Sequence, residues 1–398
     1  MAKPLAIEES PPGSAPGTGF ALWALGFRPF YLLASIFAAL SIPLWVAQYA
    51  GVLPAPYVRS PVWHGHEMLF GYAMAVIAGF LFTAGRNWSG QATPTGAALA
   101  AYALLWIAGR ILVLTPFAIA AAAVNAAFPI AVAVGLAIPF AKSRNRRNYF
   151  FVVLLVLLGG AVLAMHLSWL GVLAWPERAS LQAGLDVVLF IIAVMGGRVI
   201  PMFTNNGIPG TNATRHPLIE KLALGSVLAL LGADIVQAPA GVVALIAVAA
   251  ALAHAARLYL WQPWRTLRTP LVWVLHAAYA WIGIYLVLRA LAAVGLVGES
   301  IALHALTIGV IGGMTIGMMT RTARGHTGRP LVADGFEVAC YVLVQCAALT
   351  RVFGAMLLPD GYVYTVVVSA ICWSAAFALY AIRYWPILSR PRLDGKPG

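Results

Sequence analysis

The sequence predicts an all-α protein, a polytopic membrane helix bundle of about twelve transmembrane helices with both termini in the cytoplasm. Three observations lead to this prediction. Of the 398 residues, 62% are hydrophobic and 9% are charged, whereas about a quarter of the residues of a soluble domain are charged. The apolar runs reach the roughly 20 residues that a bilayer-spanning helix needs. Lysine and arginine collect on one side of these runs.

The apolar runs follow one another with short connections. We expect a disordered cytoplasmic tail at 1–21, a twelve-helix transmembrane domain at 22–388 and a cytoplasmic tail at 389–398. Residues 1–19 lack the apolar core of a cleavable signal peptide, so the first span is expected to direct insertion. The predicted spans are 24–49, 62–84, 96–114, 117–140, 149–172, 182–204, 218–236, 240–260, 271–293, 300–320, 335–357 and 362–385.

The positive charges test the predicted topology. Cytoplasmic loops of membrane proteins are enriched in lysine and arginine. With the N-terminus inside, five of the 25 Lys and Arg residues fall outside, namely Arg59, Arg110, Arg178, Arg289 and Arg351. The other twenty fall inside: Lys3, Arg28, Arg86, Lys142, Arg144, Arg146, Arg147, Arg198, Arg215, Lys221, Arg257, Arg265, Arg268, Arg321, Arg324, Arg329, Arg383, Arg390, Arg392 and Lys396. The net charge of +13 is therefore attributed to topology, with the lipid bilayer and not nucleic acid as partner.

The strongest local motif begins the second span and reads Trp63-His64-Gly65-His66-Glu67-Met68. In a regular helix, His64, Glu67 and Met68 share one face, whereas His66 is rotated about 200° away. The stretch is thus expected to present ligands to two neighbouring sites. Imidazole suits copper and haem iron, and a thioether favours copper(I). A hydrogen-bonded interfacial turn anchored by Trp63 is the alternative interpretation.

The tenth span begins near a further histidine, His304. His66 and His304 enter from the same outer side, and two histidines on separate helices can bind a haem iron from both faces. We therefore take His66 and His304 as candidate axial ligands, although the sequence leaves open which of His64 and His66 is the ligand. His64, with Glu67 and Met68, would form or support a copper site, in which Glu67 orients an imidazole by hydrogen bonding.

Two arginines at the predicted inner boundary are candidate cofactor-binding residues. Arg198 follows a glycine pair in the sixth span, and Arg321 ends the tenth. Each guanidinium, like that of Arg28, could pair with a propionate, an anionic substrate or a lipid phosphate. Anchoring to lipid is the simpler interpretation for all three.

Several function classes have no local support in the sequence. It contains no Walker loop, dinucleotide fingerprint or zinc-protease H-E-x-x-H motif. Twelve spans with glycine or proline near helix ends also fit a secondary transporter, in which the histidines would relay protons or metal ions. Delivery of haem or metal to an acceptor protein is a third hypothesis. The oligomeric state stays open.

Six motifs occur in order along the chain. They are Gly26-Phe27-Arg28-Pro29-Phe30, Trp63 to Gly71, Leu105-Trp106-Ile107-Ala108-Gly109-Arg110, Gly196-Gly197-Arg198-Val199-Ile200-Pro201-Met202-Phe203, His304-Ala305-Leu306-Thr307 and Gly325-His326-Thr327-Gly328-Arg329-Pro330. With them the sequence resembles the NnrS family of bacterial membrane proteins over nearly all twelve spans. The resemblance implies a haem- and copper-containing inner-membrane protein tied to denitrification and to the response to nitric oxide and nitrosative stress. Binding, sensing and redox chemistry all stay open, and so does enzymatic activity.

Overall fold

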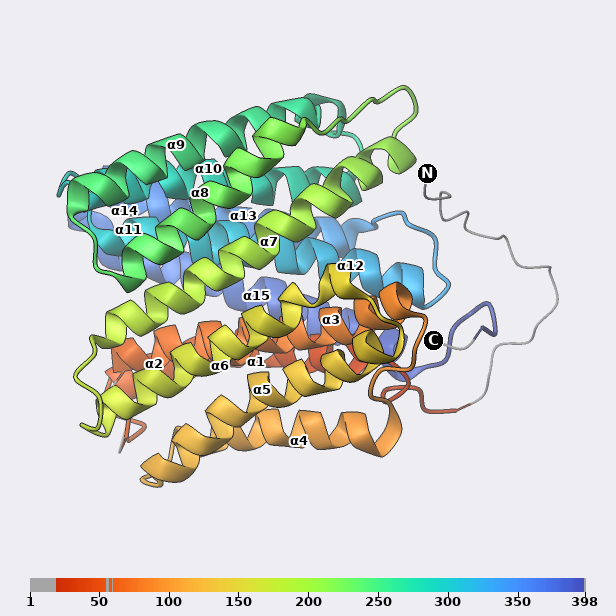
Figure 1. Cartoon of the computed structure of the whole chain (residues 1–398), viewed down its shortest axis with the longest axis horizontal. Coiled ribbons are helices and arrows are strands. Elements are labelled where there is room, and N and C mark those ends of the chain that lie inside the picture. Colours follow the sequence, from red (N-terminus) through yellow and green to blue (C-terminus); the bar gives the residue numbers. More distant parts are fainter. Residues whose placement is uncertain (1–18, 55–56, 59, 397–398) are drawn as a thin grey trace.

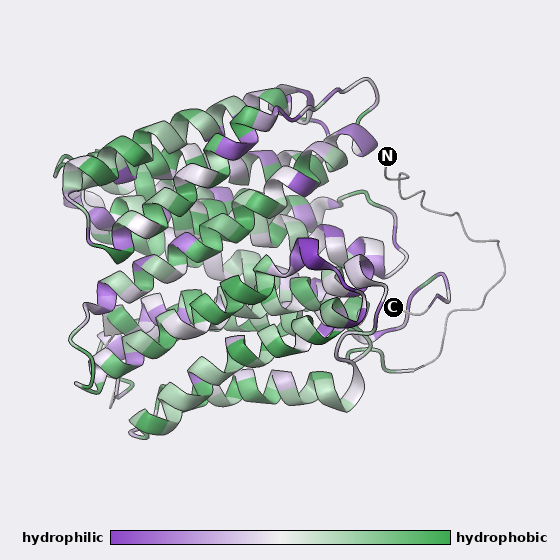
Figure 2. Cartoon of the chain, viewed as in Figure 1, coloured by the Kyte–Doolittle hydropathy of each residue, from purple (hydrophilic) through white to green (hydrophobic). Residues whose placement is uncertain are grey.

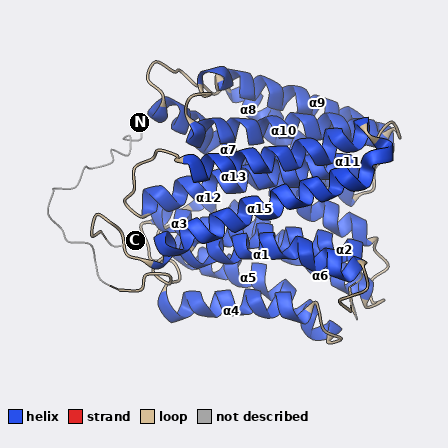
Figure 3. Ribbon diagram, turned by 180° about the vertical axis from the view of Figure 1, so that it is seen from behind, coloured by secondary structure: helices blue, strands red, loops and turns tan. Residues whose placement is uncertain are grey.

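The protein is a bundle of long helices, seen from two sides in Figures 1 and 3. The computed structural model describes residues 19–54, 57–58 and 60–396, and within them it has no strand. Most of the predicted tail 1–21 lies outside the described residues. The long helices are α1 (Phe27–Tyr49), α2 with α3 (Ser60–His66, Met74–Ser89), α4 (Gly96–Leu112), α5 (Ala118–Lys142), α6 (Phe150–Trp169), α7 (Glu177–Gly207), α8 (Pro217–Ile235), α9 (Ala240–Leu260), α10 (Pro270–Ala293), α11 with α12 (Glu299–His304, Gly313–His326), α13 with α14 (Gly335–Leu349, Ala355–Leu357) and α15 (Tyr362–Ser389).

The helices match the predicted spans one for one. Within the described part of the chain, ten are long and apolar enough to cross a membrane. The other two are α4, which has 17 residues, and α8, which carries Glu220, Lys221 and Asp234. Figure 2 shows apolar residues along the helices and most hydrophilic ones near their ends and in the loops. An all-helical, multi-pass membrane protein is thus confirmed, whereas the number of crossings and their orientation stay predictions.

The packing of the helices forms a closed ring. Successive contacts run from α1 to α3, α5, α6, α7, α10, α12, α13 and α15, and α15 returns to α1. Outside the ring, α4 packs on α5, and α8 and α9 pack on α7 and α10. We call the end where α1 begins and α15 ends the tail side, and the opposite end, which carries α2 and α11, the far side (Figure 1).

Ion pairs attach α8 to the neighbouring helices α9 and α10. Arg257 of α9 donates from Nε and Nη2 to the two carboxylate oxygens of Glu220 in α8, each at 2.7 Å. Arg289 of α10 binds both oxygens of Asp234, also in α8, at 2.5 Å. Breaking a buried pair of this kind typically costs about 3–5 kcal/mol, because one charge is left uncompensated. These pairs fix how α8 sits on its neighbours.

Glycine allows close packing where α10 meets the tenth span. Gly309 lies against the indole of Trp281 in α10, and a Cβ at this position would overlap the ring. The indole nitrogen donates to Gln345 Oε1 of α13 at 2.9 Å, which holds the ring in place. The small side chain at this position therefore has a packing role.

We predict that Gly309→Ala lowers the stability of the protein by about 1–3 kcal/mol, as overpacking does in other cores. Thermal unfolding in detergent measures this loss. Gly283→Ala in α10 is the matched control, because its added Cβ meets no atom within 4 Å. This control should be neutral or stabilising by up to about 1 kcal/mol. Equal losses in the two variants would contradict the predicted overlap.

Candidate functional site

Three π-helical segments interrupt three different spans toward the far side. They are η1 (Glu67–Ala73), η4 (Ala305–Gly312) and η5 (Thr350–Gly354). η1 starts directly after His66, and η4 starts directly after His304. Such segments are rare in helices and are frequent at functional sites. The far side therefore combines the predicted histidines with backbone that departs from the regular helix.

His66 is fully buried and belongs to a chain of hydrogen bonds. Its Nδ1 lies 2.7 Å from Glu67 Oε1, and its Nε2 lies 3.1 Å from Nε2 of His166 in α6. Nδ1 of His166 lies 2.9 Å from the hydroxyl of Tyr57. With an ionised carboxylate and neutral imidazoles, one proton arrangement satisfies every contact. Tyr57 then donates to His166, His166 donates to His66, and His66 donates to Glu67.

The charge of Glu67 is balanced by Arg110 of α4. Arg110 Nη1 donates to Glu67 Oε1 at 2.7 Å, and Nη2 donates to Oδ1 of Asn125 in α5. Nδ2 of Asn125 donates to the carbonyl of Ala121 at 2.8 Å. A buried carboxylate and a buried guanidinium that are hydrogen-bonded to each other avoid the cost of an isolated charge. This pair ties α4 and α5 to the start of η1.

The expected grouping of side chains within the motif is wrong for Glu67. A regular helix places Glu67 on the face of His64, but the structure bonds Glu67 to His66. The π-helix that begins at Glu67 changes the angular spacing of the residues after His66. Met68 accepts a hydrogen bond at its sulfur from Ser41 Oγ at 3.3 Å. A role of Met68 as a copper ligand stays a prediction.

His64 faces a different set of residues, as the motif predicts. Its ring lies 5.1 Å from that of Trp45 in α1, and its Nδ1 is buried without a hydrogen-bond partner. His304 lies within electrostatic reach of His64, and Arg351 lies within reach of both. Nδ1 of His304 lies 2.6 Å from the carbonyl oxygen of Ser300. A carbonyl oxygen can only accept, so Nδ1 of His304 carries the hydrogen and the lone pair of the neutral ring is on Nε2.

The predicted clamp of His66 and His304 stays a prediction, and the structure describes other neighbours for both histidines. His304 is near His64, whereas His66 contacts His166. His66 forms no hydrogen bond or ring contact with His304 among the residues that the structure describes. The role of His66 as an axial ligand stays a prediction, and His64 is the histidine within electrostatic reach of His304.

Arg198 and Arg321 lie toward the tail side, away from the histidines. Nη1 of Arg198 donates to Asn148 Oδ1 at 2.8 Å. The guanidinium of Arg321 stacks on the ring of Phe203, 3.7 Å from its centroid. Arg321 follows His304 in the same span by about 25 Å of helix rise. The structure thus does not bring the two predicted arginines together with the predicted histidines.

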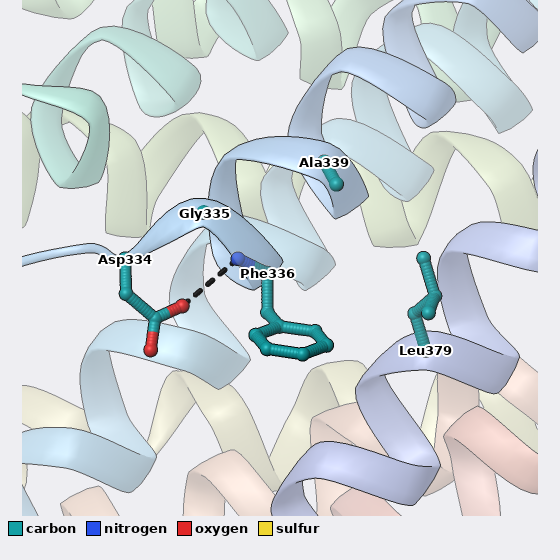
Figure 4. A pocket seen from close by; sticks show the side chains of 5 residues that line it. All are labelled: Asp334, Gly335, Phe336, Ala339 and Leu379. Atoms are coloured by element: carbon teal, nitrogen blue, oxygen red, sulfur yellow. Dashed lines mark hydrogen bonds between the residues drawn. The ribbon is translucent and has the colours of Figure 1, made fainter.

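Two further features of the described residues bear on a ligand site. They contain no group of three or more His, Cys, Asp or Glu side chains placed to hold a metal ion. A surface hollow lies between the start of α13 and Leu379 of α15 (Figure 4). Asp334, Gly335, Phe336 and Ala339 line it, and Asp334 caps α13 by accepting from the Phe336 N–H. None of the predicted site residues lines this hollow.

Sequence reasoning missed the partners of the motif. The motifs of the sequence do not include His166, and Arg110 stands in one of them without an assigned role. Arg351 was sorted as an outer charge. Each is an ionisable residue in an apolar span, and this property marks a residue as a functional candidate. That signal was present for all three, but their partners are distant in the sequence.

The fold and the site define a polytopic membrane protein whose apolar interior holds histidines, a carboxylate and arginines in hydrogen-bonded contact. A family model described as NnrS protein matches residues 21–392. Because the match covers nearly the whole chain, the protein belongs to the NnrS family, and the resemblance is confirmed. No curated protein matches the chain.

We predict that Arg110→Met lowers the free energy of unfolding by about 3–5 kcal/mol, since it leaves the Glu67 carboxylate buried without its cation. The double variant Arg110→Met/Glu67→Gln should recover part of this loss. The free energies of unfolding of both variants are measured in mixed micelles with an increasing fraction of denaturing detergent.

Arg178→Gln is the control for the loss of an arginine, because Arg178 pairs with Glu299 on the exposed surface. Exposed pairs contribute at most about 1 kcal/mol. A double variant as unstable as Arg110→Met alone would contradict the stated cause, and so would an equal effect of Arg178→Gln.

Proposed function

We propose that this NnrS family protein holds haem and copper on the far side of the bundle and acts in the response to nitric oxide and nitrosative stress in the bacterial inner membrane. Membership of the family supports the class of function. The observation that carries the assignment is the juxtaposition of His64 and His304, whose imidazoles come from separate spans and each keep a nitrogen without a protein partner.

The donor set of this site fits a haem iron. Imidazole nitrogen is a common axial ligand of haem. The Ser300 carbonyl holds the N–H of His304, so the basicity and orientation of its ring are set by the backbone. Nδ1 of His64 is buried and has no partner, which is costly unless a ligand takes it up. A haem held here would supply a redox-active iron that binds nitric oxide.

Arg351 adds a positive charge beside these imidazoles. Its Nη2 donates to Ser300 Oγ at 3.1 Å and to the Tyr362 hydroxyl at 3.0 Å, whereas Nη1 is buried without a partner. A guanidinium with a spare donor suits a carboxylate such as a propionate of a porphyrin. We therefore assign to Arg351 the role that the sequence led us to expect for Arg198 and Arg321.

The facing nitrogens of His66 and His166 are the best candidates for copper. They lie 3.1 Å apart, and two nitrogen ligands on adjacent positions of one metal ion, each about 2 Å from it, have roughly this separation. Glu67 accepts from the other nitrogen of His66 and so orients the ring. His66, His166 and Glu67 would then form the second site that the motif predicts beside His64.

We predict that His64→Ala and His304→Ala abolish the haem absorption of the purified protein, because each removes one of the two proposed ligands. Spectra of oxidised, reduced and nitric oxide-treated protein from haem-supplied cells measure this. His216→Ala is the control, since His216 is exposed in a loop, and it should keep the wild-type spectrum.

Other results would overturn the assignment. Loss of the spectrum in His66→Ala with its retention in His64→Ala would return the ligand role to His66. A haem signal that survives both His64→Ala and His304→Ala would exclude this site. A well-folded, haem-supplied wild type without haem would contradict the proposed function itself.

We predict that His166→Ala and His66→Ala lose bound copper while the haem spectrum remains. Elemental analysis of copper per protein chain measures this, with His216→Ala again as the control. Copper retained in both variants would contradict the assignment of the facing nitrogens to copper, and the haem result would be unaffected.

One buried carboxylate favours a second candidate function, a proton-coupled secondary transporter. Asp186 of α7 is fully buried, and its Oδ2 has no donor, although Gln182 donates to Oδ1 at 2.9 Å. Ionisable groups at such positions serve as proton relays in transporters. Substrate uptake that is driven by a proton gradient and lost in Asp186→Asn, in protein that contains no haem, would favour this candidate.

A further inference from the structure

Arg28, near the start of α1 on the tail side, is a fully buried cation with unused donors. Its Nη1 donates to the carbonyls of Leu388 and Arg390, at 2.9 and 2.7 Å. Its Nε and Nη2 are buried and have no hydrogen-bond partner. No carboxylate in the described part of the chain forms an ion pair with it. The neutral carbonyls therefore leave its charge uncompensated.

The unused donors of Arg28 form one edge of the guanidinium. The N–H groups of Nε and Nη2 point the same way, and arginine uses such a pair of parallel donors to bind two oxygens of one carboxylate or phosphate. A buried charged donor without an acceptor is costly. The geometry of the free edge thus specifies an oxyanion as the missing partner.

The groups around Arg28 are mainly cations. Arg329 and Arg392 lie within electrostatic reach of it, and Nη1 of Arg329 is also buried without a partner. The imidazole of His326 faces Arg28, Arg392 and Arg86. Asp394 is the acid in this group, and its hydrogen bonds with Arg392 lower its pKa to about 2, so it is ionised at neutral pH. Within the described part of this group, the cations Arg28, Arg329 and Arg392 outnumber the acid Asp394.

The C-terminal segment 390–396 packs over this group. Arg392 Nη1 donates to the carbonyl of His326 at 3.0 Å, and the N–H of Leu393 donates to the carbonyl of Thr327 at 3.1 Å. The N–H of Ala21 donates to the carbonyl of Ser389 at 2.8 Å, which joins both ends of the chain at this point. The cations are thus held together by backbone contacts from α12 and from the C-terminal segment.

We propose that Arg28 and Arg329, covered by the segment 390–396, bind a phosphate monoester or inorganic phosphate. Such a group carries about two negative charges at neutral pH and three acceptor oxygens. It therefore matches both the net positive charge of this group and the free edge of Arg28. The phosphate comes either from solution or from the headgroup of an anionic lipid, and these sources share the same recognition chemistry.

The test uses the full chain in phosphatidylcholine nanodiscs at constant ionic strength. Inorganic phosphate is titrated with chloride as the matched salt, and the shift in melting temperature is recorded. In a second arm, phosphatidic acid replaces part of the phosphatidylcholine. We expect a saturable rise in melting temperature in one arm. A rise with free phosphate indicates the soluble source, and a rise with phosphatidic acid alone indicates the lipid.

Three variants separate this site from general electrostatics. Arg28→Lys keeps the charge but loses the parallel donors, and Arg329→Gln changes a residue in the loop after α12 that needs no helix repacking. Each variant should raise the ligand concentration that gives half of the rise in melting temperature at least about tenfold. This is the effect expected from the loss of one charge-assisted hydrogen bond. Arg265→Gln is the control, because Arg265 is an exposed tail-side cation bound to the carbonyl of Gly210.

Two outcomes would overturn the site. One is the absence of a rise in either arm. The other is an equal response in wild type, Arg329→Gln and Arg265→Gln, since it would show only a general effect of anions on a basic surface. If Arg28→Lys fails to fold, the comparison of Arg329→Gln with wild type and Arg265→Gln still distinguishes a specific site from a general effect of anions.

Discussion

Buried or half-buried carboxylates that pair with arginines from other helices are the interaction on which this bundle depends. An isolated charge in an apolar interior costs several kcal/mol, so each buried acid restricts which helix can lie beside it. The pairs therefore fix the rotation and the neighbours of their helices, which apolar packing alone specifies weakly in a membrane. They are Glu67 with Arg110, Glu220 with Arg257, Asp234 with Arg289 and Glu337 with Arg324.

The pair of Glu67 and Arg110 also determines what the adjacent histidines do. Arg110 fixes the carboxylate, and the carboxylate holds Nδ1 of His66, so Nε2 of His66 is directed to His166. His64 lies about one helical turn before the π-helix and is within electrostatic reach of His304. Two histidines separated by one residue thus serve different partners because a fixed acid and a change of helix type lie directly after them.

Most of the fold was predictable, because the length and polarity of a span are local properties. A run of about 20 apolar residues specifies a helix in a bilayer without knowledge of its neighbours. The candidate site was predictable only in part. The motif identified His64, His66 and Glu67, but His166 lies 100 positions away from His66 in the sequence. The π-helix that regroups Glu67 depends on tertiary packing, so no periodicity of the sequence indicates it.

Arg110 on the far side and Arg28 on the tail side differ in how their charges are balanced, and this difference bears on their roles. On the far side, Glu67 neutralises Arg110 within the protein, and the atoms without partners include an imidazole nitrogen that suits a metal. On the tail side, Arg28 is as deeply buried but receives only carbonyl oxygens. Carbonyl dipoles solvate a cation without cancelling its charge. A folded chain that buries Arg28 in this way is therefore stabilised most by an anion that arrives from outside it.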